Sequence, residues 1–398
     1  MPNLPSVRVI VIGAGVVGCS VAYHLARGGA AVTVFDRGDL CAGMSARSGA
    51  LVRMHYTFAP EAELAWKSLE YFENWREMVG AGDCGFERTG FAVVVGPDNV
   101  EKLRANVAML RAIGVDTRLV EPSELKSLDP AFNIDDVALA AYEPRSGYAD
   151  PIATTKGFAA AAMQRSVRFA LNDSVARLQQ RGTVATSVIN AAGRRFDADA
   201  ICVVAGPWTD RLLAPFGVRI GIKAERAQVA FFHRDVALSH LACIDTIEGS
   251  YFRPHSGGLT LAGLGEWHPE ASADPDRFRE TNDADFIAEV GRRLANRIPA
   301  MRDARYSHGH AGIYDVSPDA RAVMGRVPGL EGLYVAAGFS GTGFKTAPAV
   351  GAAMAELILT GAASIAELSA FGFERLLSGK LIQSPTEYTM GAGFGHKL

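Results

Sequence analysis

Three glycines and an acid near the N-terminus have the spacing of a dinucleotide-binding motif. Gly13, Gly15 and Gly18 fit G-x-G-x-x-G. In that motif the first glycine makes a tight turn, the second lets the backbone approach a pyrophosphate, and the third lets a helix pack on a strand. Asp36 follows at the distance of the acid that binds a ribose diol. It favours FAD or NAD over NADP, whereas the adjacent Arg37 is of the type that accepts a 2′-phosphate.

A strand, a helix and a second strand must position these residues. The run 9–12 (VIVI) is β-branched and continuously apolar, as in a parallel strand that is buried on both faces. A helix is predicted over 16–27, ended by the glycines at 28–29, and a strand over 31–35 leads to the acid. This βαβ context favours dinucleotide binding; the alternative is a glycine-rich turn in an ordinary α/β domain.

Two later segments repeat the pattern of a buried strand that ends in glycine. They are 200–206 (AICVVAG) and 332–338 (GLYVAAG), and a helix is predicted after each. The second helix ends at Gly361, and its positive dipole end would point at whatever the turn FSGTGFK cradles. Three such junctions suggest one ligand edge. An NAD domain needs only the first, whereas FAD reaching into a second domain gives all three a reason.

The loop 40–56 and the region 218–315 complete the picture of two domains. The loop holds Ser45, Ser48 and Gly49, which can offer amides and hydroxyls to a pyrophosphate or a flavin ring. Arg53 lies near its end, either as a ligand for a substrate anion or as an ion-paired structural residue. The region 218–315 has short strands with Gly and Pro turns and one helix, which predicts an α+β unit.

Composition sets broad limits on function. A chain of 398 residues with 48% hydrophobic and 21% charged residues is typical of a globular enzyme with two domains. The net charge of −3 gives no indication of nucleic acid or an anionic membrane as partner. The only strongly apolar N-terminal run is too short to span a bilayer, and no charged region with a cleavage site precedes it. We therefore expect a cytoplasmic protein.

Neither cysteines nor histidines suggest a metal or a disulfide. The cysteines are scattered and form no CxxC, so reduced thiols are expected; they are Cys19, Cys41, Cys84, Cys202 and Cys243. His308 and His310 could bind a metal, but no cysteine or carboxylate cluster accompanies them. No metal is predicted.

These motifs resemble a known family. The chain is similar to FAD-dependent amine and amino-acid oxidoreductases of the D-amino acid oxidase superfamily, such as glycine oxidase, monomeric sarcosine oxidase and the β subunits of hetero-oligomeric sarcosine oxidases. The most specific parts are 11–29 (VIGAGVVGCSVAYHLARGG) with Asp36, 205–209 (AGPWT), and 314–351, which begins YDVSPDARAVMGRVPG.

The resemblance implies an α/β fold with a Rossmann-type FAD-binding domain of the glutathione reductase type and a second α+β substrate domain that carries a mixed sheet. The FAD domain would be discontinuous, with residues 1–85, 150–217 and 316–378. The substrate domain would hold 86–149 and 218–315. Independently of the resemblance, the polar and glycine-rich stretch 379–398 is predicted to form a tail.

The resemblance also implies the site residues. Val175 would meet the adenine end of FAD, and the turn 338–345 the pyrimidine edge of the flavin. The implied cofactor-binding set is Gly13, Gly15, Val16, Val17, Gly18, Asp36, Arg37, Ser45, Ala46, Ser48, Gly49, Leu51, Val175, Ala205, Gly206, Trp208, Gly312, Gly338, Ser340, Gly341, Thr342, Gly343, Phe344 and Lys345. Arg53 and Lys345 match the cations that grip the substrate carboxylate, and Tyr251 and Tyr314 match tyrosines of the substrate pocket.

Three departures from monomeric sarcosine oxidase bear on the chemistry. Gly312 stands where that enzyme attaches flavin through a cysteine, so non-covalent FAD is expected. Thr260, counted among the catalytic candidates, aligns with its oxygen-activating lysine, and Ala50 aligns with an arginine near the flavin. The electron acceptor is therefore O2 or another molecule.

The expected reaction is oxidation of the C–N bond of an amino acid or N-methyl amino acid by hydride transfer to flavin N5, which gives an imine that hydrolyses. The alternatives are a flavin-binding subunit of a hetero-oligomeric amine or opine dehydrogenase, an amine oxidase whose substrate lacks a carboxylate, and an NAD-binding dehydrogenase outside this family. The partners are a small-molecule amine, an electron acceptor, and a second copy or a partner subunit.

Overall fold

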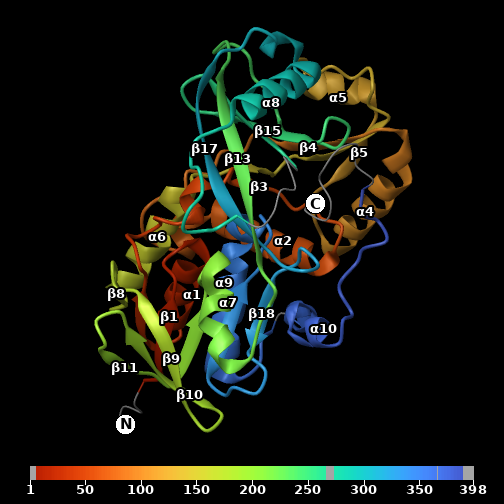
Figure 1. Cartoon of the computed structure of the whole chain (residues 1–398). Helices are drawn as coiled ribbons and strands as arrows, with labels where there is room; N and C mark the ends of the chain where they lie inside the picture. Colours follow the sequence, from red (N-terminus) through yellow and green to blue (C-terminus); the bar gives the residue numbers. More distant parts are fainter. Residues whose placement is uncertain (1–5, 266–272, 365, 389–398) are drawn as a thin grey trace.

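Two large sheets organise the chain, one in the lower and one in the upper half of Figure 1. The structure, a computed structural model, describes residues 6–265, 273–364 and 366–388. An α/β core with a second, mixed sheet is the fold class that the sequence predicts, and it is confirmed.

The lower sheet has six strands in a Rossmann-type arrangement. Their order is β18 (Val323–Arg326), β19 (Leu333–Ala337), β12 (Ala200–Val203), β1 (Arg8–Ile12), β2 (Ala31–Phe35) and β8 (Arg168–Ala170). All neighbours are parallel except β18, which pairs antiparallel with β19. Parallel strands end at one edge, so the glycines that follow β1, β12 and β19 meet there. Segments far apart in sequence thus share one ligand edge.

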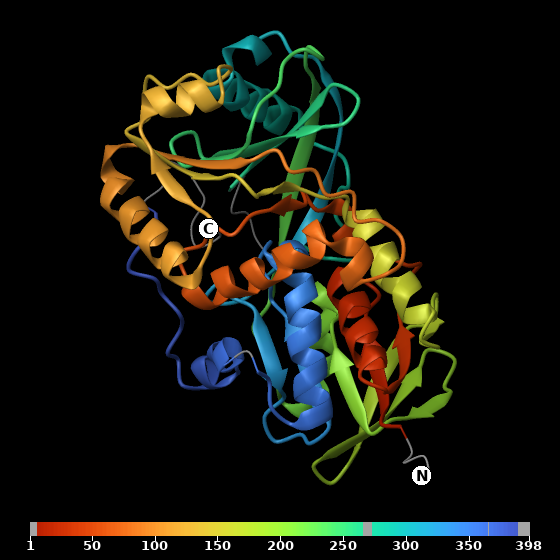
Figure 2. The same cartoon turned by 180° about the vertical axis from the view of Figure 1, so that it is seen from behind.

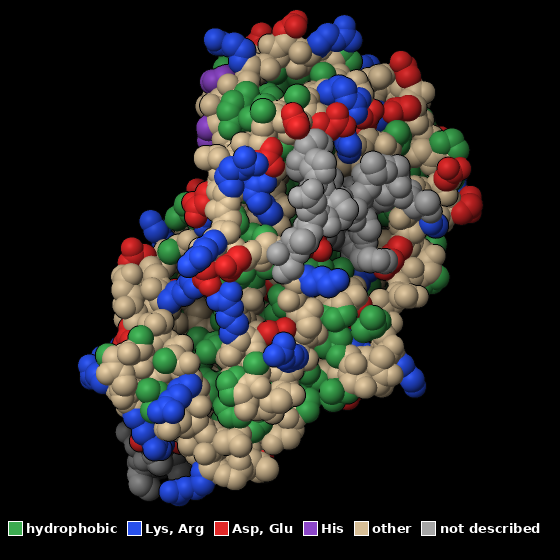
Figure 3. Space-filling view, viewed as in Figure 1, with side chains coloured by type: hydrophobic (Ala, Val, Ile, Leu, Met, Phe, Trp, Pro, Cys, Tyr) green, Lys and Arg blue, Asp and Glu red, His purple; other side chains and the backbone are tan. Residues whose placement is uncertain are grey.

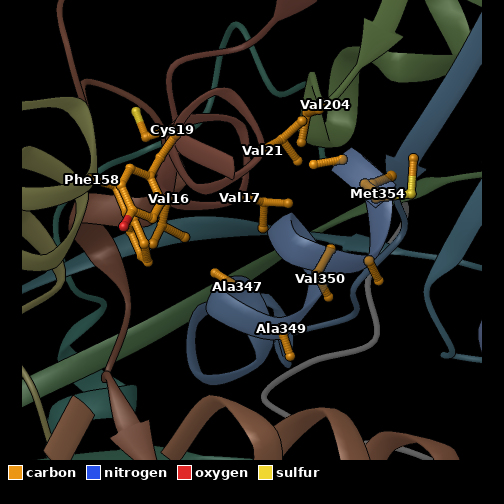
Figure 4. Packing of buried hydrophobic residues seen from close by; sticks show 14 of the residues in the cluster. Val16, Val17, Cys19, Val21, Phe158, Val204, Ala347, Ala349, Val350 and Met354 are labelled. Atoms are coloured by element: carbon orange, nitrogen blue, oxygen red, sulfur yellow. The ribbon is translucent and has the colours of Figure 1, made fainter. Parts of the chain in front are cut away.

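Helices cover this sheet, with α1 (Val16–Arg27) and α9 (Gly343–Thr360) side by side in Figure 2. Val17, Val350 and Met354 belong to the apolar cluster of these helices, shown in Figure 4. The two helices approach closely because Gly351 has no side chain: a Cβ there would lie 2.1 Å from Ser20 Oγ. Also in this half are α6 (Pro151–Met163), α2 (Ala59–Glu73) and α3 (Trp75–Met78).

The upper sheet has eight strands and is mixed. Their order is β17 (Tyr306–Val316), β13 (Lys223–His233), β16 (Leu259–Leu264), β15 (Ser250–His255), β14 (Ala242–Asp245), β4 (Phe91–Val95), β6 (Leu139–Glu143) and β5 (Arg118–Val120). Only β14 and β4 are parallel neighbours. The helices of this half are α8 (Ala284–Arg297), α4 (Val100–Ile113) and α5 (Pro122–Leu128). The long strands β13 and β17 reach down to the lower sheet (Figure 1).

Smaller elements complete the fold. A three-stranded sheet contains β9 (Val175–Arg181), β10 (Val184–Asn190) and β11 (Arg195–Asp197), and β3 (Leu51–Val52) pairs with β7 (Gly147–Tyr148). Two short helices are α7 (Thr209–Leu213) and α10 (Glu374–Leu377). After α10 the described part of the predicted tail rises toward α4 (Figure 1); residues 389–398 lie outside the described residues. No helix in the described part of the chain has the length and apolarity needed to cross a bilayer.

Candidate functional site

A cavity of about 850 Å³ lies where the two sheets meet. Its lower wall follows the ends of β1, β2 and β12 and the starts of α1 and α9. Its upper wall includes residues of β13, β15 and β17. A long ligand that enters at the lower sheet can therefore reach the upper one.

The dinucleotide end of the cavity is built from backbone. A Cβ on Gly13, whose φ is +121°, would lie 2.2 Å from the Val204 carbonyl oxygen, and one on Gly18 would lie 1.9 Å from the Gly13 oxygen. Both positions therefore exclude any side chain. Helix α1 begins at Val16, whose amide donates to Ser45 Oγ at 2.9 Å. This glycine cradle at a helix N-terminus fits the pyrophosphate of FAD.

Asp36 and Arg37 have different tasks at this end. The Asp36 carboxylate lines the cavity and accepts hydrogen bonds from the amides of Ala14 (2.7 Å) and Gly38 (2.8 Å). Arg37 donates to Asp276 Oδ1 at 2.5 Å, and its guanidinium lies 4.1 Å from the centroid of the Trp208 ring. Arg37 is thus paired with a carboxylate from the segment around 276.

A second helix N-terminus faces the cavity from the turn before α9. Gly341, with φ +92°, leaves room for the ring of Tyr314, which a Cβ would approach to 3.2 Å. Asp315 ties this turn to β17 by accepting from the amide of Gly338 at 2.8 Å, and burial raises the pKa of Asp315 to about 6. The first residues of α9 include Lys345, which lines the cavity.

The substrate end of the cavity holds two buried cations. Arg53 is 4% exposed and Lys345 is 6% exposed, and both line the cavity. The Arg53 guanidinium lies 4.6 Å and the Lys345 Nζ 5.6 Å from the centroid of the same ring, that of Tyr56. Arg53 Nη1 donates to the carbonyl oxygen of His55. Within residues 6–265, 273–364 and 366–388, neither cation has a carboxylate within 4 Å.

The positive charges of Arg53 and Lys345 repel each other, so burying both is less favourable than burying either alone. Burial, and then the charge of Arg53, hold the pKa of Lys345 well below its usual range, and Glu61 opposes this effect. Glu61 is itself paired with the buried Arg321. A bound anion between Arg53 and Lys345 would stabilise both charges, since opposite charges favour the ionised form.

Aromatic residues close the substrate end on the side of the upper sheet. Tyr251 and Tyr314 line the cavity and share a side-chain hydrogen bond. Burial, with the neighbouring Tyr314 as a second cause, raises the pKa of Tyr251 well above its usual value. Gly263 leaves room for this ring, because a Cβ there would lie 2.3 Å from it. With its pKa raised in this way, the Tyr251 side chain is neutral.

The structure brings together most of the site residues predicted from the sequence. The predicted cofactor residues line the cavity except Ala46, Gly338 and Thr342. Thr260 also lies outside the lining: it is buried on β16, with its hydroxyl 2.8 Å from His240 Nε2. The structure therefore places Thr260 apart from the residues that line the cavity.

Other residues of the site escaped the sequence prediction. Tyr56, the ring shared by the two cations, and Glu61 beside them carry no motif. Asp276, which accepts a hydrogen bond from Arg37, lies in a segment whose sequence carries no ligand-binding motif. An aromatic residue three positions after a candidate anion ligand is the one signal that could have drawn attention to Tyr56.

The described residues contain no group of three or more potential metal ligands. His308 stacks on Phe231, with ring centroids 4.4 Å apart, and a ring nitrogen of His310 lies 3.2 Å from the carbonyl oxygen of Arg47. All five cysteines are buried, and none is among the described residues that line the cavity.

A Rossmann-type sheet that opens into a cavity with two buried cations at its far end is typical of an enzyme that binds a dinucleotide cofactor. Residues 8–357 match the family model "DAO: FAD dependent oxidoreductase", and the chain belongs to this family. The predicted resemblance to the D-amino acid oxidase superfamily and the prediction of FAD are confirmed.

Known proteins align over nearly the whole chain. The chain is 28% identical to "FAD-dependent oxidoreductase domain-containing protein 1" from Bos taurus, over 96% of this chain and 87% of that protein. It is 23% identical to sarcosine oxidase subunit beta from Rhodobacter capsulatus, over 98% and 92%. The crystal structure of L-proline dehydrogenase from P. horikoshii superposes with a TM-score of 0.88 at 26% identity, over 95% and 100%. The chain is an FAD-dependent oxidoreductase.

Proposed function

We propose that this enzyme oxidises the C–N bond of an amino acid or N-methyl amino acid whose carboxylate binds between Arg53 and Lys345. The observation that carries the proposal is this pair of buried cations, which face the cavity and have no carboxylate within 4 Å among the described residues. An unpaired buried charge is costly, so a site that keeps two of them is suited to an anionic ligand.

The glycine cradle and the α9 turn would hold FAD without a covalent bond. Gly312 lies beside Arg47 at the cavity wall, and neither a cysteine nor a histidine is among the described lining residues, which supports non-covalent binding. Bound FAD supplies the acceptor, at N5, for the hydride that leaves the substrate carbon, and the imine product leaves and hydrolyses in water.

The residues at the substrate end orient the substrate. The Arg53 guanidinium can bind a carboxylate through two parallel hydrogen bonds, and Lys345 adds a point charge. Such fixed orientation can supply several kcal/mol of the barrier, up to about 7–11 in the best cases. The N-terminus of α9 favours negative charge in the cavity that its first residues line.

The same two cations favour the reactive protonation state of the amine. Oxidation requires a neutral amine, because an ammonium group has no lone pair to assist loss of hydride. Positive charges near a bound amine lower its pKa. Glu61, the carboxylate beside Lys345, is already engaged by Arg321, so it does not compensate fully.

We also propose the assignment of domains that the two sheets support. Residues 1–85, 150–217 and 316–378, which supply the strands of the six-stranded sheet, would bind FAD. Residues 86–149 and 218–315, which supply most of the eight-stranded sheet, would cover the substrate.

A partner subunit is the second candidate, because one relative that aligns over most of its length is named as a subunit. In that case the chain purified alone binds FAD but shows no turnover. Co-purification of a second polypeptide, followed by recovery of turnover on mixing, would support this arrangement. Full turnover by the single chain would exclude it.

The test of the carboxylate site is an anaerobic titration of the flavin-loaded enzyme with carboxylated amines, each paired with its amide. We expect the carboxylates alone to bleach the flavin absorbance. The variants Arg53→Met and Lys345→Met should each raise KM for the carboxylate about 10- to 100-fold, with little change in FAD content. Unchanged KM in both variants would show that the assignment is wrong.

A further inference from the structure

The chain returns to the cation site near its C-terminal end. Residues 382–388, called here the C-terminal strap, connect the two halves of the molecule. Ser384 Oγ donates to the carbonyl oxygen of Thr57 at 2.6 Å, and Asn106 of α4 donates to the carbonyl oxygen of Thr386 at 3.1 Å. The strap is therefore fastened both to the segment that carries Arg53 and to the upper half.

The last described residue of the strap, Tyr388, makes a buried pair with His55. The Tyr388 hydroxyl lies 2.6 Å from His55 Nε2, and the rings stack at 5.9 Å with 19° between their planes. Burial lowers the pKa of His55 to about 3, so the imidazole is neutral. His55 Nδ1 is buried without a hydrogen-bond partner. Among the described residues, Tyr388 is thus the sole hydrogen-bond partner of this ring.

His55 in turn leads directly to both cations. Its carbonyl oxygen accepts the hydrogen bond from Arg53 Nη1, and the next residue, Tyr56, supplies the ring over which Arg53 and Lys345 lie. The backbone of 55–56 therefore fixes the position of the guanidinium and of the shared ring. A displacement of the His55 imidazole would move both.

A second contact of the strap reaches the charges beside Lys345. Glu387 Oε1 lies 3.1 Å from Nη2 of Arg321, which is fully buried. Arg321 pairs on its other side with Glu61, whose charge raises the pKa of Lys345. The strap is thus connected to Arg53 through His55 and to Lys345 through this charge pair.

We infer that the strap positions the carboxylate site, with Tyr388 as its main positioning residue. Tyr388 is not a catalytic residue, because it does not line the cavity. It packs in the same apolar cluster as Leu51, Ile244 and Tyr251, which do line it. This inference rests on the proposed function of Arg53 and Lys345.

The chain offers a matched control for a mutation of Tyr388. In the lower half, the hydroxyl of Tyr71 lies 3.0 Å from Nε2 of His24, and burial lowers the pKa of His24 to about 3 as well. Neither residue lines the cavity. Loss of either tyrosine hydroxyl removes one buried Tyr–His hydrogen bond, and loss of the Tyr388 hydroxyl also removes a side-chain hydrogen bond with Asn106. A purely structural role therefore predicts that both variants lose stability and that neither loses acetate affinity.

The experiment compares Tyr388→Phe and Tyr71→Phe as flavin-loaded enzymes. Acetate serves as the probe, with acetamide as its uncharged isostere, and binding is measured by flavin absorbance and by the acetate-dependent rise in Tm. We expect Tyr388→Phe to weaken acetate binding about tenfold, with normal FAD content. Tyr71→Phe should lower Tm to a similar extent and leave acetate binding unchanged. With a substrate, Tyr388→Phe should raise KM more than it lowers kcat.

The outcomes separate this inference from the proposed function. If Arg53→Met and Lys345→Met lose acetate binding while Tyr388→Phe keeps it, the role of the strap is wrong and the carboxylate site stands. If the two cation variants bind acetate normally, the carboxylate site itself is wrong. Should Tyr388→Phe fail to fold, Glu387→Gln replaces it, since that side chain is 21% exposed. Normal acetate affinity in Glu387→Gln would then overturn the inference.

Discussion

The two ends of the cavity are built from different materials. The dinucleotide end consists of backbone, and its shape depends on atoms that are absent: no side chain fits at Gly13 or Gly18. The substrate end consists of buried charged side chains, chiefly Arg53, Lys345 and the ion pair beside them. Steric fit therefore determines which ligand the first end can hold, and electrostatics determines this at the second end.

This difference determines how each end can fail. A backbone cradle tolerates changes of charge around it but no added methyl group. A cluster of buried charges tolerates small changes of shape, but a buried charge that loses its partner is costly because water is excluded. Mutations that change only volume or only charge should therefore separate the two ends.

The largest effect is expected from removal of a charge at the substrate end. Arg321 is fully buried and pairs with Glu61, which is 2% exposed. Arg321→Met leaves that carboxylate buried without its partner, and should lower the free energy of unfolding by about 3–5 kcal/mol. Denaturant unfolding measures this loss. Glu61→Gln in the same chain should recover part of it.

The control for this experiment is an exposed ion pair. Arg8 pairs with Asp199 at 2.7 Å, with side chains 55% and 47% exposed. Arg8→Met should leave the free energy of unfolding almost unchanged, because an exposed ion pair contributes little to stability. Equal losses in Arg8→Met and Arg321→Met would contradict the electrostatic description of the substrate end.

The steric description is tested by one methyl group. Gly18→Ala places a Cβ 1.9 Å from the Gly13 carbonyl oxygen, so α1 must move away from β1. We expect a loss of about 3 kcal/mol in stability and a protein that retains little FAD. Unfolding curves and the ratio of flavin to protein absorbance measure both effects.

Gly29→Ala is the matched change in open space. Gly29 has φ +89°, with no atom within 4 Å of an added Cβ. It should cost only the backbone strain of an alanine there, about 1–2 kcal/mol, and leave FAD content normal. A stable Gly18→Ala protein that keeps its FAD would show that FAD binding does not depend on the absence of a side chain at this position.

A smaller effect concerns pH at the substrate end. Burial and Arg53 lower the pKa of Lys345, whereas a bound carboxylate favours its charged form. Binding of acetate therefore takes up a proton wherever Lys345 is neutral in the free enzyme. We expect the affinity to fall as pH rises, by up to about tenfold per pH unit, and the fall to begin below the pH at which an ordinary lysine titrates.

Two variants identify the group that titrates. Lys345→Met should bind acetate weakly and without this fall. Glu143, buried near Arg53 and with a pKa raised by burial to about 7, also titrates close to the site. Glu143→Gln should keep the fall if Lys345 is responsible. A fall that disappears in Glu143→Gln and persists in Lys345→Met would reverse the assignment.

The contrast between the two ends also explains what the sequence could predict. The dinucleotide end lies within one βαβ unit, so the spacing of Gly13, Gly15, Gly18 and Asp36 carries it, and the predicted helix over 16–27 agrees with α1. The α/β unit and the second, α+β unit followed from such local patterns, whereas the mixed sheet came from the resemblance. The assignment of roles to Arg53 and Lys345 came from the resemblance and remains a proposal.

The side-chain pairs at the substrate end could not be predicted, because each joins two residues that are far apart in the sequence. Arg321 and Glu61 are 260 residues apart in sequence, and Tyr388 and His55 are 333 apart. A single sequence shows no periodicity that links such pairs. Polar and glycine-rich residues made 379–398 resemble a tail, whereas Tyr388 within it is 8% exposed. An aromatic residue in a polar segment was the available signal.

The smallest effect is expected at the exposed rim of the dinucleotide end. Asp276 accepts hydrogen bonds from Arg211, from Arg37 and from Trp208 Nε1 at 2.9 Å, and these hold the pKa of Asp276 well below the usual range. These side chains are one-third to one-half exposed, and Figure 3 shows basic and acidic side chains gathered at mid-height on this face. Because salt screens exposed ion pairs, we expect the ion pairs of Asp276 to contribute little to the retention of FAD.

Asp276→Asn should therefore release FAD only about threefold faster at low salt, and the difference should vanish at high salt. Stopped-flow dilution of the flavin-loaded enzyme measures the rate. Asp274→Asn is the control, because the ion pair of Asp274 with Arg211 is longer, at 3.4 Å, than that of Asp276. A loss of FAD as large as that of Gly18→Ala would mean that charge, and not the glycine cradle, retains the cofactor. Charged side chains would then determine binding at both ends of the cavity, and the contrast between a steric and an electrostatic end would be wrong.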